Sequence, residues 1–247
     1  MHCNHHLYSL YVDAIYDIME PILAKRVNEE GQLLTKESDF VIEIYIDCYF
    51  YNLHLDRSNK TGSIVMNCNP FTNGHRYLIE QALDVMGFLI IFVVEENHFL
   101  LSFTERFAMV RDSVKDLKNV MVVPSGPFIL SRTTFPEYFL KAADEDLVEN
   151  VENDITLFAQ RIAPHLNITY RFVGEEPEDS VTNEYNLAMK RILPKKGIQL
   201  VEIPRRRHNG SYISASAVRR CLGAYDLDGL KGLVPESTMK VLFAKNE

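Results

Sequence analysis

Two short polar segments, far apart in the chain, carry side chains suited to holding a phosphate group. The first reads NPFTNGH at residues 69–75, and its Thr72, Gly74 and His75 stand directly before an amphipathic helical pattern. A hydroxyl, an imidazole and the unpaired N–H groups of a helix N-terminus are good partners for phosphate oxygens. Gly74 also allows the backbone to approach a ligand closely. This segment therefore predicts a phosphate-binding loop.

The second segment reads YISASAVR at residues 212–219, where Ser214 and Ser216 begin a predicted helix and Arg219 follows one turn later. Serines at such positions are ordinary N-caps. Their hydroxyl and N–H groups, together with Arg219, are equally suited to the β- and γ-phosphates of a nucleotide. The basic run Arg205–His208 precedes this segment in an otherwise acidic chain, either as a solvated loop or as a clamp for phosphate groups.

The elements that position both segments follow from alternating strand and helix patterns. The predicted strands are 63–66, 88–94, 120–124, 168–173 and 198–203, and the predicted helices are 76–83, 102–117, 133–148, 151–163, 181–193 and one beginning at Ser214. This alternation predicts an α/β fold with a Rossmann-like, doubly wound five-stranded parallel sheet and right-handed crossovers. In such a sheet the ligand lies beyond the carboxyl ends of the strands, where the strand order reverses. We therefore expect both segments to line one pocket.

Residues 1–58 are predicted to form a helical N-terminal segment. Apolar residues recur at helical spacing over 7–29, with Pro21 inside the run. The 36–55 segment alternates like a strand in part, but its polar residues gather on one helical face, which favours a helix. A polar linker at 57–61 is the expected boundary. It divides the chain into 1–58 and 59–247.

The composition restricts the class of protein. The chain has 247 residues, of which 47% are hydrophobic, and a formal net charge of −8, which argues against nucleic acid as a partner. The four cysteines, at positions 3, 48, 68 and 221, have no CxxC spacing, and the sequence contains no signal peptide and no apolar run of membrane-spanning length. We therefore expect reduced thiols, a cytoplasmic protein and no membrane partner.

Both segments resemble the signatures of a known superfamily. TxGH at 72–75 is similar to the [TH]xGH motif of nucleotidyltransferases, and ISASAVR at 213–219 is similar to their ISx[ST]xx[RK] motif. The stretches NPFTNGHRYLIEQA, FVVEE, PSGPFILSRTTFPEYFLK, RFVGEEP and VEIPR resemble the citrate lyase ligase branch in particular. The resemblance covers about residues 60–245 and implies the strand order 3-2-1-4-5.

The resemblance implies roles for individual residues. Thr72 and His75 match the catalytic pair that contacts the α-phosphate. The nucleotide-binding positions that it implies are Asn67, Asn69, Phe71, Gly74, Gly174, Glu175, Ile213, Ser214, Ser216 and Arg219. The acceptor-side positions are Arg106, Ser131 and Arg132, and Glu184 is either a Mg²⁺ ligand or an exposed helical carboxylate. The other positions also have plain structural alternatives, such as a helix cap or a loop.

The resemblance further implies a reaction. ATP, accompanied by Mg²⁺, activates acetate as acetyl-adenylate and releases pyrophosphate, and the acetyl group then passes to the thiol prosthetic group of the citrate lyase acyl carrier protein. The family normally has an acetyltransferase-like domain ahead of this one, and residues 1–58 are too few for it. Two alternatives therefore stay open: nucleotidyl transfer to a small phosphorylated substrate, and a non-catalytic nucleotide-binding scaffold. The expected small-molecule partners are a nucleoside triphosphate and a small carboxylate.

Overall fold

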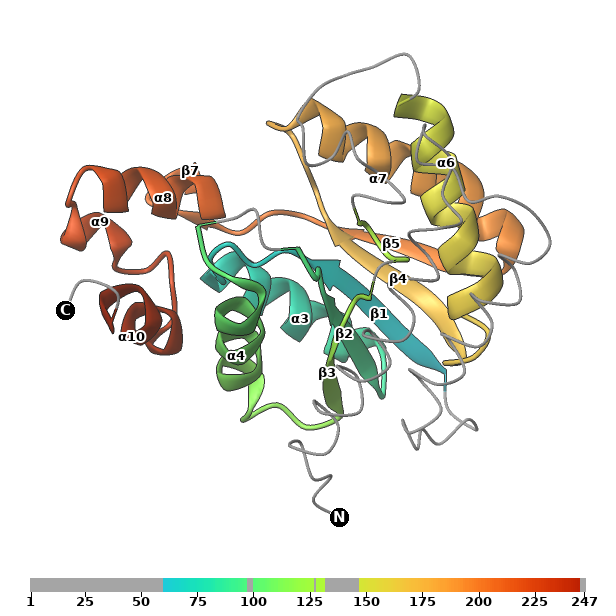
Figure 1. Cartoon of the computed structure of the whole chain (residues 1–247), viewed down its shortest axis with the longest axis horizontal. Coiled ribbons are helices and arrows are strands. Elements are labelled where there is room, and N and C mark those ends of the chain that lie inside the picture. The colour runs from blue at the N-terminus through green and yellow to red at the C-terminus, as the bar shows by residue number, and fades with distance from the viewer. Residues whose placement is uncertain (1–59, 97–99, 127, 132–146, 245–247) are drawn as a thin grey trace, which may run out of the picture.

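A computed structural model describes residues 60–96, 100–126, 128–131 and 147–244 (Figure 1). The helices predicted at 7–29 and 36–55, the boundary near residue 58 and most of the helix predicted at 133–148 lie outside these ranges. Arg132 lies outside them as well. The fold described below is therefore that of the predicted nucleotide-binding part.

A five-stranded parallel sheet forms the centre of the molecule, in the order β3-β2-β1-β4-β5. The strands are β1 Thr61–Met66, β2 Leu89–Val93, β3 Val120–Pro124, β4 Ile168–Gly174 and β5 Gln199–Ile203. All four neighbouring pairs are parallel, and Val65 of β1, for example, is paired with Phe92 of β2. The predicted strand order 3-2-1-4-5 is confirmed.

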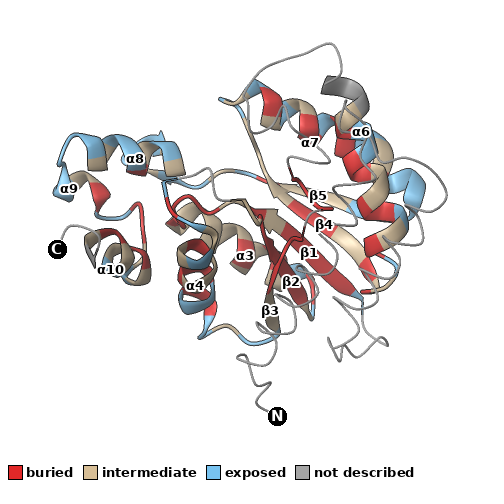
Figure 2. Ribbon diagram, viewed as in Figure 1, coloured by how far each residue is buried: buried red, intermediate tan, exposed pale blue. Residues whose placement is uncertain are grey.

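Helices cover both faces of the sheet, which explains why strand β2 is apolar throughout. One face carries α3 (Asn73–Val85) and α4 (Phe103–Val114), and the other carries α6 (Leu147–Leu157) and α7 (Ser180–Ile192) (Figure 1). Ile79 and Met109 belong to the core on the first face, and Ile155 and Ala188 to the core on the second. Strand β2 is buried along its whole length (Figure 2).

Short elements complete the described chain. The π-helix η1 (Phe158–Ile162) extends α6, so the helix predicted at 151–163 is present with a change of pitch at its end. The 3₁₀-helix η2 (Leu193–Lys196) follows α7, and a hairpin joins β6 (Arg207–His208) to β7 (Ser211–Tyr212). No helix among these described residues has the length and apolar character needed to cross a bilayer.

The described chain ends in three helices, α8 (Ala215–Gly223), α9 (Leu227–Leu230) and α10 (Glu236–Ala244), of which α10 packs beside α4 (Figure 1). Leu230 and Leu242 are buried in the same core as α3 and α4. The Thr238 hydroxyl donates to the Phe71 carbonyl at 3.0 Å, and the Asn73 side chain donates to the Gly232 carbonyl at 2.8 Å. This C-terminal unit therefore supports the loop between β1 and α3.

Candidate active site

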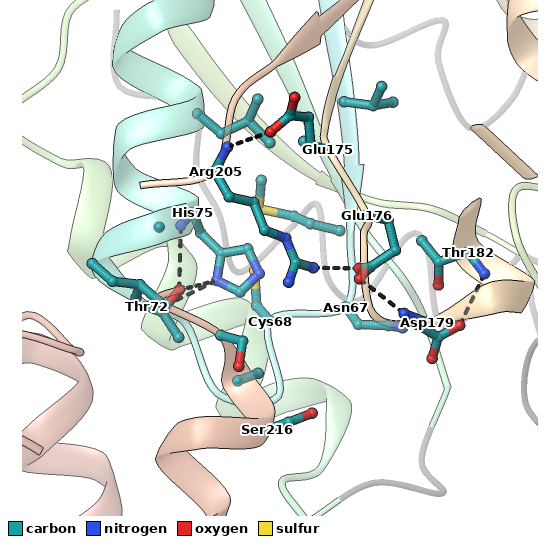
Figure 3. A pocket seen from close by; sticks show the side chains of 18 of the residues that line it. Asn67, Cys68, Thr72, His75, Glu175, Glu176, Asp179, Thr182, Arg205 and Ser216 are labelled. Carbon is teal, nitrogen blue, oxygen red and sulfur yellow. Dashed lines mark hydrogen bonds and ion pairs between the residues drawn. The ribbon is translucent and has the colours of Figure 1, made fainter. Parts of the chain in front are cut away.

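A cavity of about 830 Å³ opens at the carboxyl ends of β1, β4 and β5 (Figure 3). Strand order reverses between β1 and β4, and this is where parallel α/β sheets bind their ligands. The volume lies within the range of roughly 300–1,000 Å³ that is typical of ligand pockets. The loops after β1, β4 and β5 and the start of α8 all contribute to its walls.

Most of the predicted site residues meet in this cavity. Its walls include Asn67, Asn69, Thr72, Gly74, His75, Gly174, Glu175, Ile213, Ser214, Ser216 and Arg219. The two polar segments that the sequence separates by about 140 residues therefore face one space. The N-terminal ends of α3 and α8 both face it, which supplies two positive helix-dipole ends to the same cavity.

Thr72 and His75 form a capping box at the start of α3. The Thr72 hydroxyl accepts from the His75 backbone N–H at 3.3 Å, and His75 Nδ1 accepts from the Thr72 backbone N–H at 3.0 Å. A Glu or Gln usually provides the returning acceptor in this motif, and here an imidazole does. Because a backbone N–H can only donate, we assign the proton of the neutral ring to Nε2.

The charge state of His75 follows from its surroundings. Burial of the ring, and then the positive charge of Arg205, lower the pKa of His75 to about 4. The imidazole is therefore neutral at pH 7. In that state its Nε2–H is a hydrogen-bond donor, and the ring is not a general acid.

Gly74 joins the two segments by allowing them to touch. A Cβ atom at this position would lie 3.1 Å from the Ile213 carbonyl oxygen and 3.3 Å from the Thr72 hydroxyl oxygen. Contacts of this length are tighter than a side chain normally makes, so the glycine is required for a close approach and not for an unusual backbone angle. The first segment thus packs its backbone directly against the second.

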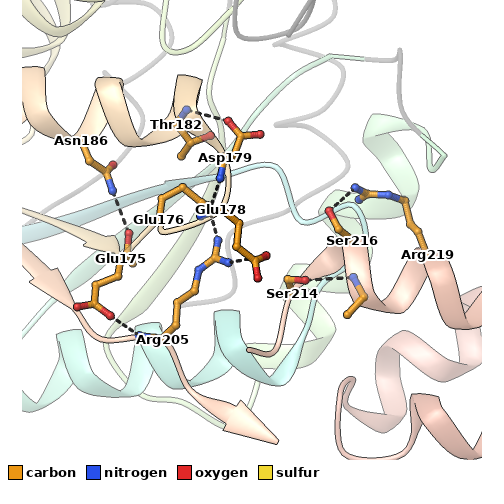
Figure 4. A network of polar contacts seen from close by, with 12 residues as sticks. Glu175, Glu176, Glu178, Asp179, Thr182, Asn186, Arg205, Ser214, Ser216 and Arg219 are labelled. Carbon is orange, nitrogen blue, oxygen red and sulfur yellow. Dashed lines mark hydrogen bonds and ion pairs between the residues drawn. The ribbon is translucent and has the colours of Figure 1, made fainter. Parts of the chain in front are cut away.

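The serines of the second segment have different partners. The Ser214 hydroxyl is the N-cap of α8 and accepts from the Ala217 N–H at 3.1 Å. The Ser216 hydroxyl accepts from Arg219 Nη2 at 2.9 Å, and Arg219 Nη1 donates to the Asn69 carbonyl at 2.6 Å (Figure 4). Arg219 therefore connects the start of α8 with the loop after β1, across 150 positions of the sequence.

A second polar network lies across the cavity, between the loops after β4 and β5 (Figure 4). The Arg205 guanidinium forms an ion pair with Glu176, and its backbone N–H donates to the Glu175 carboxylate at 3.3 Å. The Asn186 amide of α7 donates to the Gly174 carbonyl at 3.0 Å. The basic run is thereby divided: Arg205 lines the cavity, whereas Arg207 is exposed on the β6–β7 hairpin, 4.3 Å from the Tyr212 ring centre.

Other predicted site residues do not line the cavity. Arg106 is fully buried, because carbonyl oxygens of three chain segments surround its guanidinium: it donates to Asn67 at 2.7 Å, to Leu101 at 3.3 Å and to Glu96. Its side chain supports the loop after β1 from behind. Phe71 is also fully buried, with its ring in the core.

The remaining two expectations concern Ser131 and Glu184. Ser131 is buried directly after Leu130, and Leu130 lines the cavity whereas Ser131 does not. The Glu184 carboxylate lies 3.6 Å from the guanidinium of Arg191, about two helical turns further along α7, and it is not part of the cavity wall. Glu184 thus forms an ion pair along its own helix.

Along α7 the sequence reasoning assigned a role to Glu184, but it assigned none to Arg171, Asp179, Thr182, Tyr185 or Asn186, which form the α7 side of the cavity. One signal was present in the sequence. Arg171 is the one charged residue of β4, and a charged residue is costly to bury in a strand without a partner.

The sheet order, the helices on both faces and the cavity at the switch point define a Rossmann-like, doubly wound α/β protein with a ligand pocket at the carboxyl ends of its strands. Residues 61–242 match the family described as the citrate lyase ligase C-terminal domain, and the chain belongs to that family.

Two curated relatives carry the name [Citrate [pro-3S]-lyase] ligase. That of Klebsiella pneumoniae is 38% identical over 201 residues, which is 79% of this chain and 58% of the relative. That of Haemophilus influenzae is 44% identical over 193 residues, which is 74% of this chain and 56% of the relative. The chain thus spans a little over half the length of these relatives.

Among solved structures, Thermotoga maritima TmcAL bound with alpha-thio ATP gives a TM-score of 0.46 at 15% identity, covering 76% of this chain and 56% of that one.

Proposed function

We propose that this cavity binds ATP and activates a small carboxylate, acetate in the first instance, as its acyl-adenylate. The observation that carries the proposal is the meeting of the two polar segments around one space, with two helix N-termini and a neutral His75 facing it. The family of the chain and the names of its relatives, which are citrate lyase ligases, support a ligase reaction.

In the proposed step a carboxylate oxygen attacks the α-phosphorus of ATP. The new O–P bond forms as the bond from the α-phosphorus to the oxygen bridging to the β-phosphate breaks, and pyrophosphate leaves. A carboxylate is already ionised at pH 7, so no proton has to be removed. Positioning and charge stabilisation are then the main requirements. A neutral His75 that donates from Nε2 meets them, because the α-phosphate oxygens gain charge as the bonds rearrange.

In this proposal each of the two polar segments binds a different part of the nucleotide. Thr72, His75 and the N-terminus of α3 face the α-phosphate, while Ser216, Arg219 and the N-terminus of α8 face the β- and γ-phosphates. Gly174, Glu175 and Ile213 border the ribose and the base. These assignments place all three phosphates against positive helix ends and a guanidinium.

Magnesium enters this scheme with the triphosphate. Glu184 does not line the cavity, and the described residues contain no cluster of three His, Cys, Asp or Glu side chains that would hold a metal ion. The residues present therefore do not fit a protein-held magnesium site. Mg²⁺ prefers phosphate oxygens and water to an all-protein cage, so we assign none of these residues as its ligand.

The second proposed step transfers the acyl group to a thiol on a carrier protein, for which the resemblance to citrate lyase ligases implies the citrate lyase acyl carrier protein. The thiol sulfur attacks the acyl carbon, the C–S bond forms, the bond to the AMP oxygen breaks, and the thiol proton is released to solvent.

The test is exchange of labelled pyrophosphate into ATP by the full chain, with and without acetate. Exchange that requires acetate supports the proposal. Exchange in the absence of any acid would replace it with simple nucleotidyl transfer, and ATP binding without exchange for any acid would favour the scaffold alternative.

His75→Ala provides the first mutational prediction for this assay. We expect the exchange rate to fall on the order of 10²- to 10³-fold, because one charge-stabilising donor is removed. The control is His165→Ala, since His165 lies just before β4, at the opposite end of the sheet. An unchanged rate in His75→Ala would remove the main catalytic assignment.

A further inference from the structure

The α7 side of the cavity contains a buried arginine whose donors are only partly used. Arg171 lies within β4, is 3% exposed and lines the cavity. Its Nε and Nη1 atoms are both buried and make no hydrogen bond. An arginine offers five N–H donors, and buried donors are nearly always paired in folded proteins. Two buried donors of Arg171 therefore lack an acceptor within the protein, and a bound ligand would supply one.

The neighbours of Arg171 do not supply the missing acceptors. The centre of its guanidinium lies 4.8 Å from the centre of the Phe158 ring, a cation–π contact that satisfies no N–H group. The acid that acts electrostatically on Arg171 is Asp154, which is fully buried and accepts from the Tyr185 hydroxyl at 2.5 Å and from the Leu130 N–H at 2.9 Å. Asp154 balances the charge of Arg171 through space without bonding to its two buried nitrogens.

Apolar side chains are also present in this cavity. Val65, Leu130, Val173 and Met189 line it together with Arg171 and with the more polar residues of the α7 side. One buried guanidinium beside apolar side chains suits an amphiphilic anion with a short alkyl group. The charge of Asp154 favours a monoanion over a dianionic phosphate, because the carboxylate repels a dianion more strongly than a monoanion. The planar guanidinium also matches the two oxygens of a carboxylate.

We propose that Arg171 binds the carboxylate of the acid substrate, in a subsite on the α7 side of the cavity whose alkyl-binding wall includes Leu130 and Met189. This inference rests on the proposed function and adds the location of the acid. It also replaces Arg106 as the acid-binding arginine, because Arg106 is held by carbonyl groups outside the cavity wall.

The first experiment compares Arg171→Met with Arg171→Lys in the full chain. Arg191→Met is the matched control, since Arg191 is an arginine of α7 outside the cavity wall. In acetate-dependent exchange we expect Arg171→Met to raise the KM for acetate about 10- to 100-fold. The affinity for ATP should change less than about 3-fold, and the lysine variant should recover part of the loss. Equal loss of acetate and ATP affinity, or an unchanged acetate KM, would overturn the proposal.

The second experiment separates this inference from the proposed reaction. Binding of ¹³C-labelled acetate is measured by NMR with α,β-methylene ATP, which cannot release pyrophosphate, and inorganic phosphate is the comparison ligand. If the chain shows no exchange with any acid, acetate binding that is lost in Arg171→Met still supports the subsite. If the natural chain shows exchange but Arg171→Met binds acetate as well as the natural chain does, the subsite is wrong and the proposed function is unaffected.

A third variant covers the case in which Arg171→Met does not fold. Met189→Ala enlarges the space beside the alkyl-binding wall and leaves the guanidinium of Arg171 in place. We therefore expect the exchange rate with butyrate to rise relative to that with acetate. An unchanged ratio of butyrate to acetate would contradict the subsite.

Discussion

At the scale of the residue, His75 has two tasks that depend on the same hydrogen bond. Its Nδ1 closes the capping box of α3, and this contact leaves Nε2–H as the donor. Burial and Arg205 keep the pKa of the ring well below neutrality. An imidazole held in this way is pre-oriented, so it needs little rearrangement when charge develops on a phosphate.

Gly74→Ala tests the contact between the two segments. Alanine is a better helix former than glycine by about 1 kcal/mol, so the substitution should not destabilise α3 by itself. The added Cβ would press on the Ile213 carbonyl oxygen, 3.1 Å away. We therefore expect ATP affinity to fall about 10-fold, measured by calorimetry, while the melting temperature is retained.

Gly87→Ala is the matched control for Gly74→Ala, because a Cβ at Gly87 would meet nothing within 4 Å. Equal ATP affinity in both variants would show that the close approach at Gly74 is not needed for nucleotide binding.

At the scale of the element, the C-terminal helices form part of the binding site as well as part of the core. The loop after β1 is held from three directions: by Arg106 of α4, by Arg219 of α8 and by Thr238 of α10. Hydrogen bonds to these buried carbonyls are costly to lose, because the carbonyl is then left without a partner. The loop is thus fixed before a nucleotide arrives.

Arg219→Ala tests the end of the nucleotide that α8 binds. We expect the affinity for ATP to fall more than the affinity for AMP, because only ATP carries β- and γ-phosphates. Isothermal titration of both nucleotides measures the difference, and Arg111→Ala on the exposed side of α4 is the control. Equal weakening of ATP and AMP would move Arg219 away from the β/γ end.

At the scale of the whole molecule, the charge of the cavity is opposite to that of the chain. The formal net charge is −8, whereas the cavity is lined by five arginines, Arg171, Arg205, Arg206, Arg219 and Arg220, and by four acids, Glu175, Glu176, Glu178 and Asp179. A pocket that is richer in cations than the rest of the molecule can hold a small anion, while the negative chain repels long polyanions.

Stability should depend on pH through His75. Its pKa is about 4 in the folded protein and near 6.5 in an unfolded chain, so the unfolded state binds the proton more readily. The resulting contribution to stability is fully present above pH 6.5 and is lost as the pH falls toward 4. Urea unfolding should show a steeper loss of free energy over this window in the natural chain than in His75→Gln.

The glutamine variant can keep the returning acceptor of the capping box but does not titrate in this range. The same pH dependence in both proteins would mean that His75 is not the group responsible.

Much of the fold could be predicted from the sequence, because its signals are local. The run at 88–94 is apolar along its whole length, as a strand covered on both faces must be, and TxGH and ISASAVR mark the starts of α3 and α8. Short elements without a strong pattern, such as the β6–β7 hairpin and α9, were not predicted.

The sequence by itself determined the class of sheet, the order of its elements and the two segments that face the cavity. Only the tertiary structure decided which arginines face that cavity: Arg171 and Arg205 line it, whereas Arg106 is enclosed by carbonyl groups behind it. The physical reason is that secondary structure follows from spacing along the chain. Whether a charge lies in a wall or behind it depends on contacts between residues far apart in the sequence.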